Sequence, residues 1–301
     1  MTPAVSTAVA LAAANRRGIV YMALAMAAFI VNDSLIKLAS ESMPAAQAIA
    51  VRGLFATAFV MAVVLAGGHG RALRHLAEPN VAARALFDTI GTFSYLFALF
   101  HLPLANATAI NMAAPLVICA LAALVLGESV GWRRWSAVGA GFVGVLLVVR
   151  PLPGAFDGWA LLCLGATFLL ALRDIFTRRI AAAIPSIVVT LSTAVMVTAV
   201  GCVWATVEGW RPMTIGQITL LAAASVFLAG GYYGVTVAMR AGELSVTGSF
   251  RYTGLLAALA IDLVVWRHVP DGPALAGSAL LVGAGLYILH RERVRARAAG
   301  G

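Results

Sequence analysis

The fold class is decided by two neighbouring stretches, PLVICALAALVL at residues 115–126 and VGAGFVGVLLVV at residues 138–149. Both are apolar without interruption, whereas the strands of a membrane barrel alternate apolar and polar residues over about ten positions. A backbone inside lipid must satisfy its hydrogen bonds internally, as a helix or a closed barrel does. The two stretches therefore predict membrane-spanning helices.

The composition extends this prediction to the whole chain. Of the 301 residues, 62% are hydrophobic and only 11% are charged, whereas soluble domains have about 25% charged residues. A helix needs roughly 20 apolar residues to cross a bilayer. We predict an all-α membrane protein with a loose tail at residues 1–16, a basic C-terminal tail and ten spans, which lie near residues 17–40, 45–67, 81–101, 104–126, 132–150, 155–181, 185–208, 214–240, 243–267 and 271–290.

Basic residues are distributed unevenly between the predicted loops. If the N-terminus is cytoplasmic, fourteen fall in inside segments and three, Arg150, Arg211 and Arg267, fall outside. Cytoplasmic loops carry the excess of basic residues in membrane proteins, so we expect a multi-pass protein of a bacterial-type inner membrane with both termini in the cytoplasm. The net charge of +9 then reflects topology and contact with the lipid bilayer. No nucleic-acid partner is expected, because no basic stripe with interleaved aromatic residues occurs.

A repeat of constant offset links the two halves of the chain. Five positions recur 141 residues later: Asp33 as Asp174, Lys37 as Arg178, Pro44 as Pro185, Gly144 as Gly285 and Arg150 as Arg291. Each half holds five spans, an odd number, so the second half must be inverted in the membrane. The sequence therefore predicts two inverted five-helix repeats, residues 1–150 and 151–301, with a substrate site near the midplane between them.

A second group of residues carries a family resemblance. It consists of Ala107-Thr108, Pro115, Leu126-Gly127-Glu128, Gly139 and Gly144-Val145. The pattern resembles the fourth and fifth helices of EamA-type transporters in the drug/metabolite transporter superfamily, and the chain is most similar there to the YddG-type exporters of amino acids, including aromatic ones. The resemblance implies a ten-helix exporter of small metabolites. The second half departs from the pattern, because Arg267-His268 stands where the first half has Gly127-Glu128.

Several motifs have simpler readings than a cofactor or metal site. The stretch from Gly139 to Gly144 matches G-x-G-x-x-G, but no strand and acidic residue frame it as a dinucleotide site requires, and small residues also let membrane helices pack closely. The three cysteines lie far apart inside predicted spans without metal-ligand spacing. Glu128 is expected in a loop ion pair or a gating contact. No cofactor and no metal are predicted.

Ionisable residues inside spans are costly to bury and mark structural pairs or transport pathways. Four acids are embedded: Asp33, Asp88, Asp174 and Asp262. Three have a base one helical turn away, which places both charges on one face: Lys37 for Asp33, Arg84 for Asp88 and Arg178 for Asp174. These pairs have a structural role or take part in proton coupling or ammonium binding. We predict that Asp33 stays paired with Lys37 and carries no proton.

Arg52 and Arg251 have no acid within four residues, so each must face a cavity, an acid on another helix, or a ligand. On an offset of 140, Arg251 matches Asn111, which predicts that the two face each other across the axis between the halves. An amino-acid pocket needs an apolar or aromatic wall and a few polar groups. The remaining candidates, which could equally serve interhelical packing, are Tyr95, Tyr232, Tyr233, Tyr252 and Asn106.

These observations predict a secondary transporter that exports small metabolites by alternating access, with neutral and aromatic amino acids as the expected cargo. No G-x-x-x-x-G-K-[ST] motif for nucleotide hydrolysis occurs. The alternative is an exporter of another metabolite or drug. An enzyme is not predicted, because the five histidines lie in loops or at helix ends and form no catalytic constellation within a span.

Overall fold

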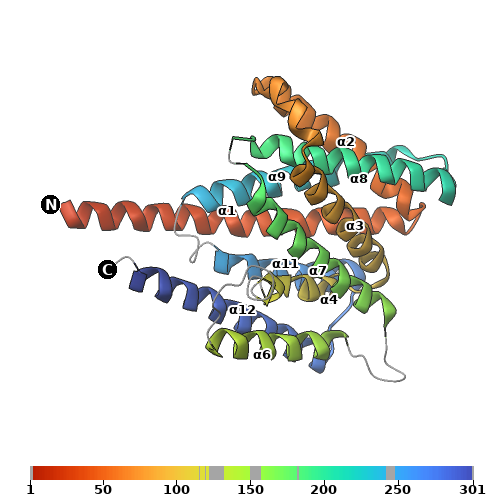
Figure 1. The fold of residues 1–301 in the computed structure, drawn as a ribbon. Helices are drawn as coiled ribbons and strands as arrows, with labels where there is room; N and C mark the ends of the chain where they lie inside the picture. The colour runs from red at the N-terminus through yellow and green to blue at the C-terminus, as the bar shows by residue number, and fades with distance from the viewer. Residues whose placement is uncertain are drawn as a thin grey trace.

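The computed structural model describes residues 3–114, 116–118, 120–121, 132–149, 157–181, 183–241 and 248–299. This part of the chain is helical and contains no strand. The helices form a bundle in which α1 begins and α12 ends at the same side (Figure 1). We call this side the termini side and the opposite one the distal side.

The helices follow the predicted order of spans. The first half contains α1 (Pro3–Ser40), α2 (Ala45–Ala66), the 3₁₀ segment η1 (His69–Ala77), α3 (Pro79–His101), α4 (Leu104–Asn111) and α6 (Trp132–Val149). The second half contains α7 (Gly158–Arg179), α8 (Ser186–Glu208), α9 (Ile215–Ala241), the 3₁₀ segment η2 (Gly248–Tyr252), α11 (Thr253–Ile261), the π-helical η3 (Asp262–Trp266) and α12 (Gly272–Ala299).

Proline marks the start of several helices. Pro44, Pro103 and Pro185 directly precede α2, α4 and α8, and Pro79 is the first residue of α3. Proline fits there because the first N–H groups of a helix have no intrahelical acceptor in any case. The opposite end of α8 is set by Gly209, whose φ of 99° suits glycine.

Two predictions about element boundaries are wrong. Residues 1–16 were expected as a loose tail, but α1 begins at Pro3, because the alanine-rich segment that follows favours a helix. The predicted spans 104–126 and 243–267 are not single helices. The first breaks after Asn111, where Pro115 has no N–H to donate to residue 111, and the second combines 3₁₀, α- and π-helical segments.

The helices pack in pairs that combine the two halves of the chain. The most extensive contacts are α1 with α9, α3 with α7, α2 with α8, and α6 with α12. Glycine permits two of these approaches: a Cβ on Gly144 of α6 would lie 2.8 Å from the Gly277 carbonyl oxygen of α12, and one on Gly201 of α8 would lie 3.1 Å from Cα of Ala50 in α2. The glycines of the G-x-G-x-x-G stretch thus include a packing residue.

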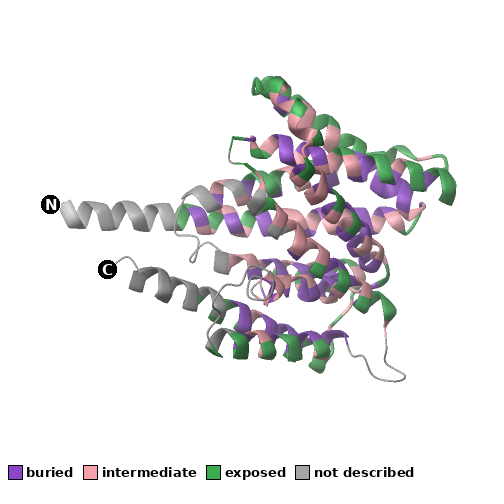
Figure 2. Cartoon of the chain, in the orientation of Figure 1, coloured by how far each residue is buried: buried purple, intermediate pink, exposed green. Residues whose placement is uncertain are grey.

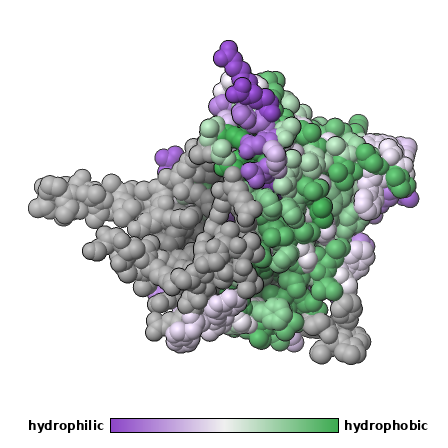
Figure 3. All heavy atoms as spheres, viewed as in Figure 1, coloured by the Kyte–Doolittle hydropathy of each residue, from purple (hydrophilic) through white to green (hydrophobic). Residues whose placement is uncertain are grey.

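The outside of the bundle is apolar. Large exposed hydrophobic side chains occur on α1, α2, α8 and α9, where exposed residues recur along the helices (Figure 2). Hydrophobic residues also cover much of the coloured surface in Figure 3. Four helices are long and apolar enough to cross a membrane, namely Arg16–Ser40, Ala45–Ala66, Ser186–Glu208 and Ile215–Val235. Shorter apolar segments are Leu104–Ile118, Trp135–Val149, Gly158–Arg173 and Gly272–Tyr287. An exposed apolar surface of this extent is stable only in lipid, so the chain is a multi-pass membrane protein.

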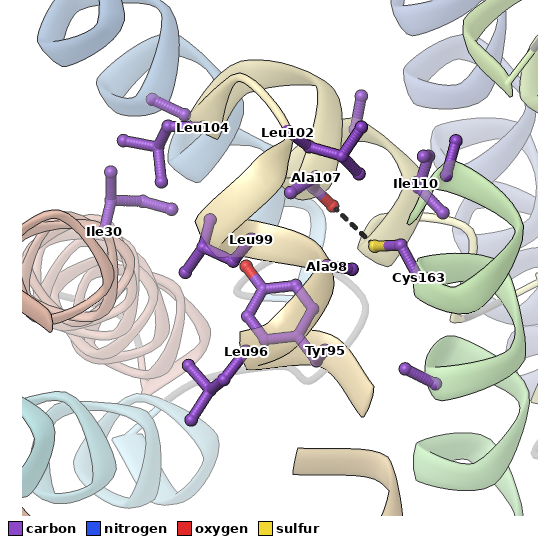
Figure 4. Close-up of a cluster of buried hydrophobic side chains, with 14 of the residues drawn as sticks. Ile30, Tyr95, Leu96, Ala98, Leu99, Leu102, Leu104, Ala107, Ile110 and Cys163 are labelled. Atoms are coloured by element: carbon purple, nitrogen blue, oxygen red, sulfur yellow. Dashed lines mark hydrogen bonds between the residues drawn. The ribbon is translucent and has the colours of Figure 1, made fainter. Parts of the chain in front are cut away.

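The interior is filled where α3, α4 and α7 meet. Leu96, Leu99 and Ile110 are among the buried side chains there (Figure 4). Cys163 of α7 lies among them, and its thiol contacts the Ala107 carbonyl oxygen at 3.7 Å. Cys163 is therefore a buried apolar residue, as predicted.

Candidate substrate-binding cavity

A cavity of about 280 Å³ lies inside the bundle. Its walls come from both halves of the chain: α1, α2, α3 and α4 from the first and α7, α8, α9 and α11 from the second. Ligand pockets in proteins measure about 300–1,000 Å³, so this cavity is of a size for a small metabolite.

A polar chain of four residues crosses one part of the cavity wall. The Tyr95 hydroxyl of α3 donates to Asp33 Oδ2 of α1 at 2.9 Å, and Asn32 Nδ2 donates to Asp33 Oδ1 at 2.9 Å. Arg52 of α2, which is 5% exposed, donates from Nη1 to Asn32 Oδ1 at 3.3 Å. A carboxylate and a guanidinium thus lie next to each other in an apolar protein interior, an arrangement found at functional sites in membranes.

A second charged group lies nearer the termini side of the cavity. Asp88 of α3, which is 3% exposed, lies 3.4 Å from Arg84 Nη1 and accepts a hydrogen bond of 3.0 Å from Arg173 Nη1 of α7. Arg84 also donates to Thr193 of α8 at 2.6 Å and to Thr177 of α7 at 3.0 Å. Asp88 therefore interacts with both Arg84 and Arg173, and its bond to Arg173 joins α3 to the second half of the chain.

Apolar and aromatic residues complete the wall between these two polar groups. Phe29 of α1 and Tyr232 of α9 meet edge to face, with ring centroids 5.3 Å apart. Met26 of α1 and Met112, just after α4, also line the cavity. Methionine and aromatic side chains can adapt to an apolar part of a ligand.

The distal ends of the helices are joined by polar contacts outside this cavity. Lys37 Nζ donates to the Leu99 carbonyl oxygen at 2.7 Å and also to that of Leu102, both at the end of α3. Asp262 accepts hydrogen bonds from the first N–H groups of α4, at Leu104 (3.1 Å) and Ala105 (2.7 Å). Both charges therefore satisfy helix ends, where backbone groups lack intrahelical partners.

A buried glutamine joins the α1–α2 region to the α8–α9 connection on the same side. Gln47 Nε2 donates to the Arg211 carbonyl oxygen at 2.7 Å, and Gln47 Oε1 accepts from the Arg211 N–H at 3.0 Å. Glu208 accepts from the Ala46 N–H at 2.8 Å, and Trp266 Nε1 donates to Glu41 at 2.8 Å. Contacts between the halves are thus dense at the distal side.

Some sequence-based candidates line the cavity and others do not. Asn111, Tyr95 and Tyr232 lie in its wall, together with Asp33, Arg52 and Asp88. Asn106 instead lines a separate cavity of about 240 Å³ near His268 and Asp157 on the distal side. Among the described residues, Arg251, Tyr233 and Tyr252 are not part of the central wall.

The last three residues occupy other environments. Tyr233 is 66% exposed on α9, and Tyr252 is 6% exposed with its hydroxyl packed against Gly285 of α12. Arg251 is half-buried in the short segment η2. Arg251 thus does not line the wall that contains Asn111. The expected opposition of the two residues across the axis between the halves stays a prediction.

The expected pairing of acids with nearby bases holds in one case. Asp88 pairs with Arg84, as predicted. The predicted Asp33–Lys37 pair is wrong, since the lysine reaches the end of α3 and Asp33 bonds Tyr95 and Asn32. The side chains of Asp174 and Arg178, and the residues Glu128 and Cys119, lie outside the described part.

Sequence reasoning missed two members of the site. Asn32 was not singled out, although an amide inside an apolar span is itself a signal of a buried polar network. Arg173 was not singled out either, and the packing of α7 on α3 brings it to Asp88.

Taken together, an apolar exterior, a helical bundle and an internal cavity with buried charges are features that membrane transporters share. Residues 16–150 match the model of the EamA-like transporter family. The match covers just under half of the chain, so in this part the chain resembles EamA-like transporters.

Named relatives carry different cargoes. The chain is 24% identical to an S-adenosylmethionine uptake transporter of Rickettsia bellii, over 92% of this chain and 94% of that protein. It is 24% identical to the pseudopaline exporter CntI of Pseudomonas aeruginosa (strain UCBPP-PA14), over 89% and 94%, and 26% identical to a riboflavin transporter of Rhizobium johnstonii, over 74% and 72%. A crystal structure with 18% identity has a TM-score of 0.62 over 92% of this chain and 97% of that one, which shows a shared fold.

Proposed function

We propose that this protein exports amino acids, the neutral and aromatic ones among them, across a bacterial inner membrane. One observation carries the proposal: the cavity of about 280 Å³ combines adjacent opposite charges, Asp33 and Arg52, with an apolar and aromatic wall. An amino acid combines an ammonium and a carboxylate with a side chain, so each part finds a matching surface. The YddG-type resemblance of the sequence supports the same cargo.

The architecture that we propose is ten helices in two inverted repeats, residues 1–150 and 151–301. The pairing of helices supports it. In the two halves, α1 corresponds to α7, α2 to α8, α3 to α9 and α6 to α12. Exchanging these counterparts converts the α1–α9 contact into the α3–α7 contact and leaves the α2–α8 and α6–α12 contacts unchanged. Thr57 of α2 and Thr198 of α8 bond at 2.9 Å and are separated by 141 residues, the offset of the sequence repeat. Equivalent residues meet in this way at an axis between halves.

Transport then proceeds by alternating access. With both termini in the cytoplasm, the polar contacts of Lys37, Gln47 and Asp262 hold the periplasmic ends together, and the Arg84–Asp88–Arg173 group lies on the cytoplasmic side of the cargo. Release to the outside requires the distal contacts to open while α3, α7 and α8 close below the site.

The experiment that tests this function is transport into and out of proteoliposomes with a panel of labelled amino acids, with and without a proton gradient. We expect saturable transport of neutral amino acids. Transport of labelled S-adenosylmethionine or riboflavin, in the absence of any amino-acid transport, would instead support the alternative of another small metabolite, which the named relatives favour.

A further inference from the structure

Arg52 carries a donor that the protein leaves unused. The side chain is 5% exposed and lies in the cavity wall, and Nε has no acceptor among the described residues. The Arg52 side chain donates one hydrogen bond within the described part of the chain, from Nη1 to Asn32 Oδ1. A buried hydrogen-bond donor without an acceptor costs free energy. A ligand that supplies an acceptor for Nε therefore stabilises the site.

Asn32 holds Arg52 next to an acid. Its amide oxygen accepts from Arg52 at 3.3 Å, while its amide nitrogen donates to Asp33 at 2.9 Å. The guanidinium and the carboxylate therefore lie at the two ends of one side-chain amide. The other buried acid in the wall, Asp88, is already shared by Arg84 and Arg173.

We propose that Arg52 and Asp33 bind the head group of an α-amino acid, an inference that rests on the proposed function. The free Nε of Arg52 donates to the carboxylate, for which the planar guanidinium is well shaped. Asp33 accepts from the ammonium, and Tyr95 and Asn32 hold the acid in place. In an α-amino acid, the ammonium and the carboxylate are attached to the same carbon. This short separation matches Arg52 and Asp33, which lie on either side of the Asn32 side-chain amide.

The cargo side chain then points along the rest of the cavity, toward Phe29, Tyr232 and Met26. This places the carboxylate at Arg52 on α2, and not at Arg251, which lies outside the described wall. The assignment predicts that the protein requires a free carboxylate and a free ammonium on one carbon and tolerates variation in the side chain.

A competition series on the unmodified protein tests the assignment without any risk of misfolding. The competitors of a labelled, transported amino acid are the unlabelled acid, its amide, its N-acetyl derivative and the decarboxylated amine. We expect the last three to compete about tenfold to a hundredfold more weakly, the loss that follows from a missing charged hydrogen bond. Equal competition by the amide overturns the assignment, whereas absence of any amino-acid transport overturns the proposed function itself.

Variants assign the effect to Arg52. In R52Q, the KM for the free acid should rise about tenfold or more while the KM for the amide stays near that of the unmodified protein. R52K keeps the positive charge but lacks the planar guanidinium, so its KM for the free acid should lie between those of the unmodified protein and R52Q. R71Q makes the same change at an exposed arginine of η1 and should leave both KM values unchanged. Thermal unfolding in detergent shows whether R52Q folds. If it folds and transports the free acid and the amide equally weakly, Arg52 has a structural role. If it does not fold, the competition series on the unmodified protein decides.

Discussion

Two neighbouring charged residues of α1 reach different partners on α3. Asp33 and Lys37 are one turn apart on α1. Lys37 bonds backbone carbonyls at the end of α3, and Asp33 bonds Tyr95 and Asn32. Asp33 therefore has no pairing with Lys37 that would keep it charged, and it is a residue of the cavity wall.

Replacing Tyr95 with Phe tests the role given to Asp33. The change removes one hydrogen bond to the carboxylate and keeps the buried ring, so we expect weaker transport, by about threefold to tenfold in kcat/KM, with little loss of stability. Transport kinetics in proteoliposomes and thermal unfolding measure the two quantities. Y287F makes the same change at an exposed tyrosine of α12 and serves as control. A folded Y95F protein with unchanged kinetics would show that this bond does not position Asp33.

At the same scale, the sequence predicted part of the site. Spacing was sufficient for Arg84 and Asp88, because both lie on one helix face and bond there. It was insufficient for Arg173, which bonds Asp88 on α3, and for Asn32, which accepts a hydrogen bond from Arg52 on α2. A contact between helices depends on how they are rotated against each other, which one chain's spacing does not encode.

Elements of the bundle meet where side chains are small. Gly144 of α6 faces the backbone of α12 at Gly277, and Gly201 of α8 faces Ala50 of α2. The sequence predicted close packing from the glycines between Gly139 and Gly144, and it predicted the order of helices from the long apolar runs; Gly201 was not singled out. It did not predict the irregular segments around residues 112 and 248–266, because a hydropathy pattern continues across a break in the backbone hydrogen bonds.

Replacing Gly144 with Ala should destabilise the α6–α12 pair. The added methyl group would lie 2.8 Å from a carbonyl oxygen of the Gly277 backbone, and overpacking of this kind costs about 1–3 kcal/mol. Gly139, five residues earlier on the same helix, has no atom within 4 Å of an added Cβ. G139A should therefore leave the unfolding temperature in detergent unchanged or raise it. Equal effects of G144A and G139A would mean that the close approach of α6 and α12 contributes nothing to stability.

The molecule as a whole combines a symmetric pattern of helix pairs with an asymmetric distribution of polar contacts. The pairing of helices is the same from either half, whereas the hydrogen bonds of Lys37, Gln47 and Asp262 all lie at the distal side. A transporter with a symmetric framework can exchange the roles of its two ends, and the distal contacts stabilise one of the two states. The orientation of the bundle then decides whether that state takes up cargo from the cytoplasm.

Labelling of single cysteines tests the orientation, after replacement of Cys119, Cys163 and Cys202. Arg211 lies in the distal connection between α8 and α9, and Arg71 lies in η1 between α2 and α3 on the termini side; both are exposed. The distal side carries three basic residues in our topology and the termini side fourteen, which favours a cytoplasmic termini side.

A membrane-impermeant maleimide should therefore label a cysteine at position 211 in intact cells and label one at position 71 only after the membrane is permeabilised. Both positions should react in detergent, which controls for accessibility of the thiol itself. Labelling of position 71 from outside would place the termini in the periplasm. The state with joined distal ends would then face outward, and the cavity would collect cargo from the periplasm, as expected of an uptake system and contrary to the export that we propose.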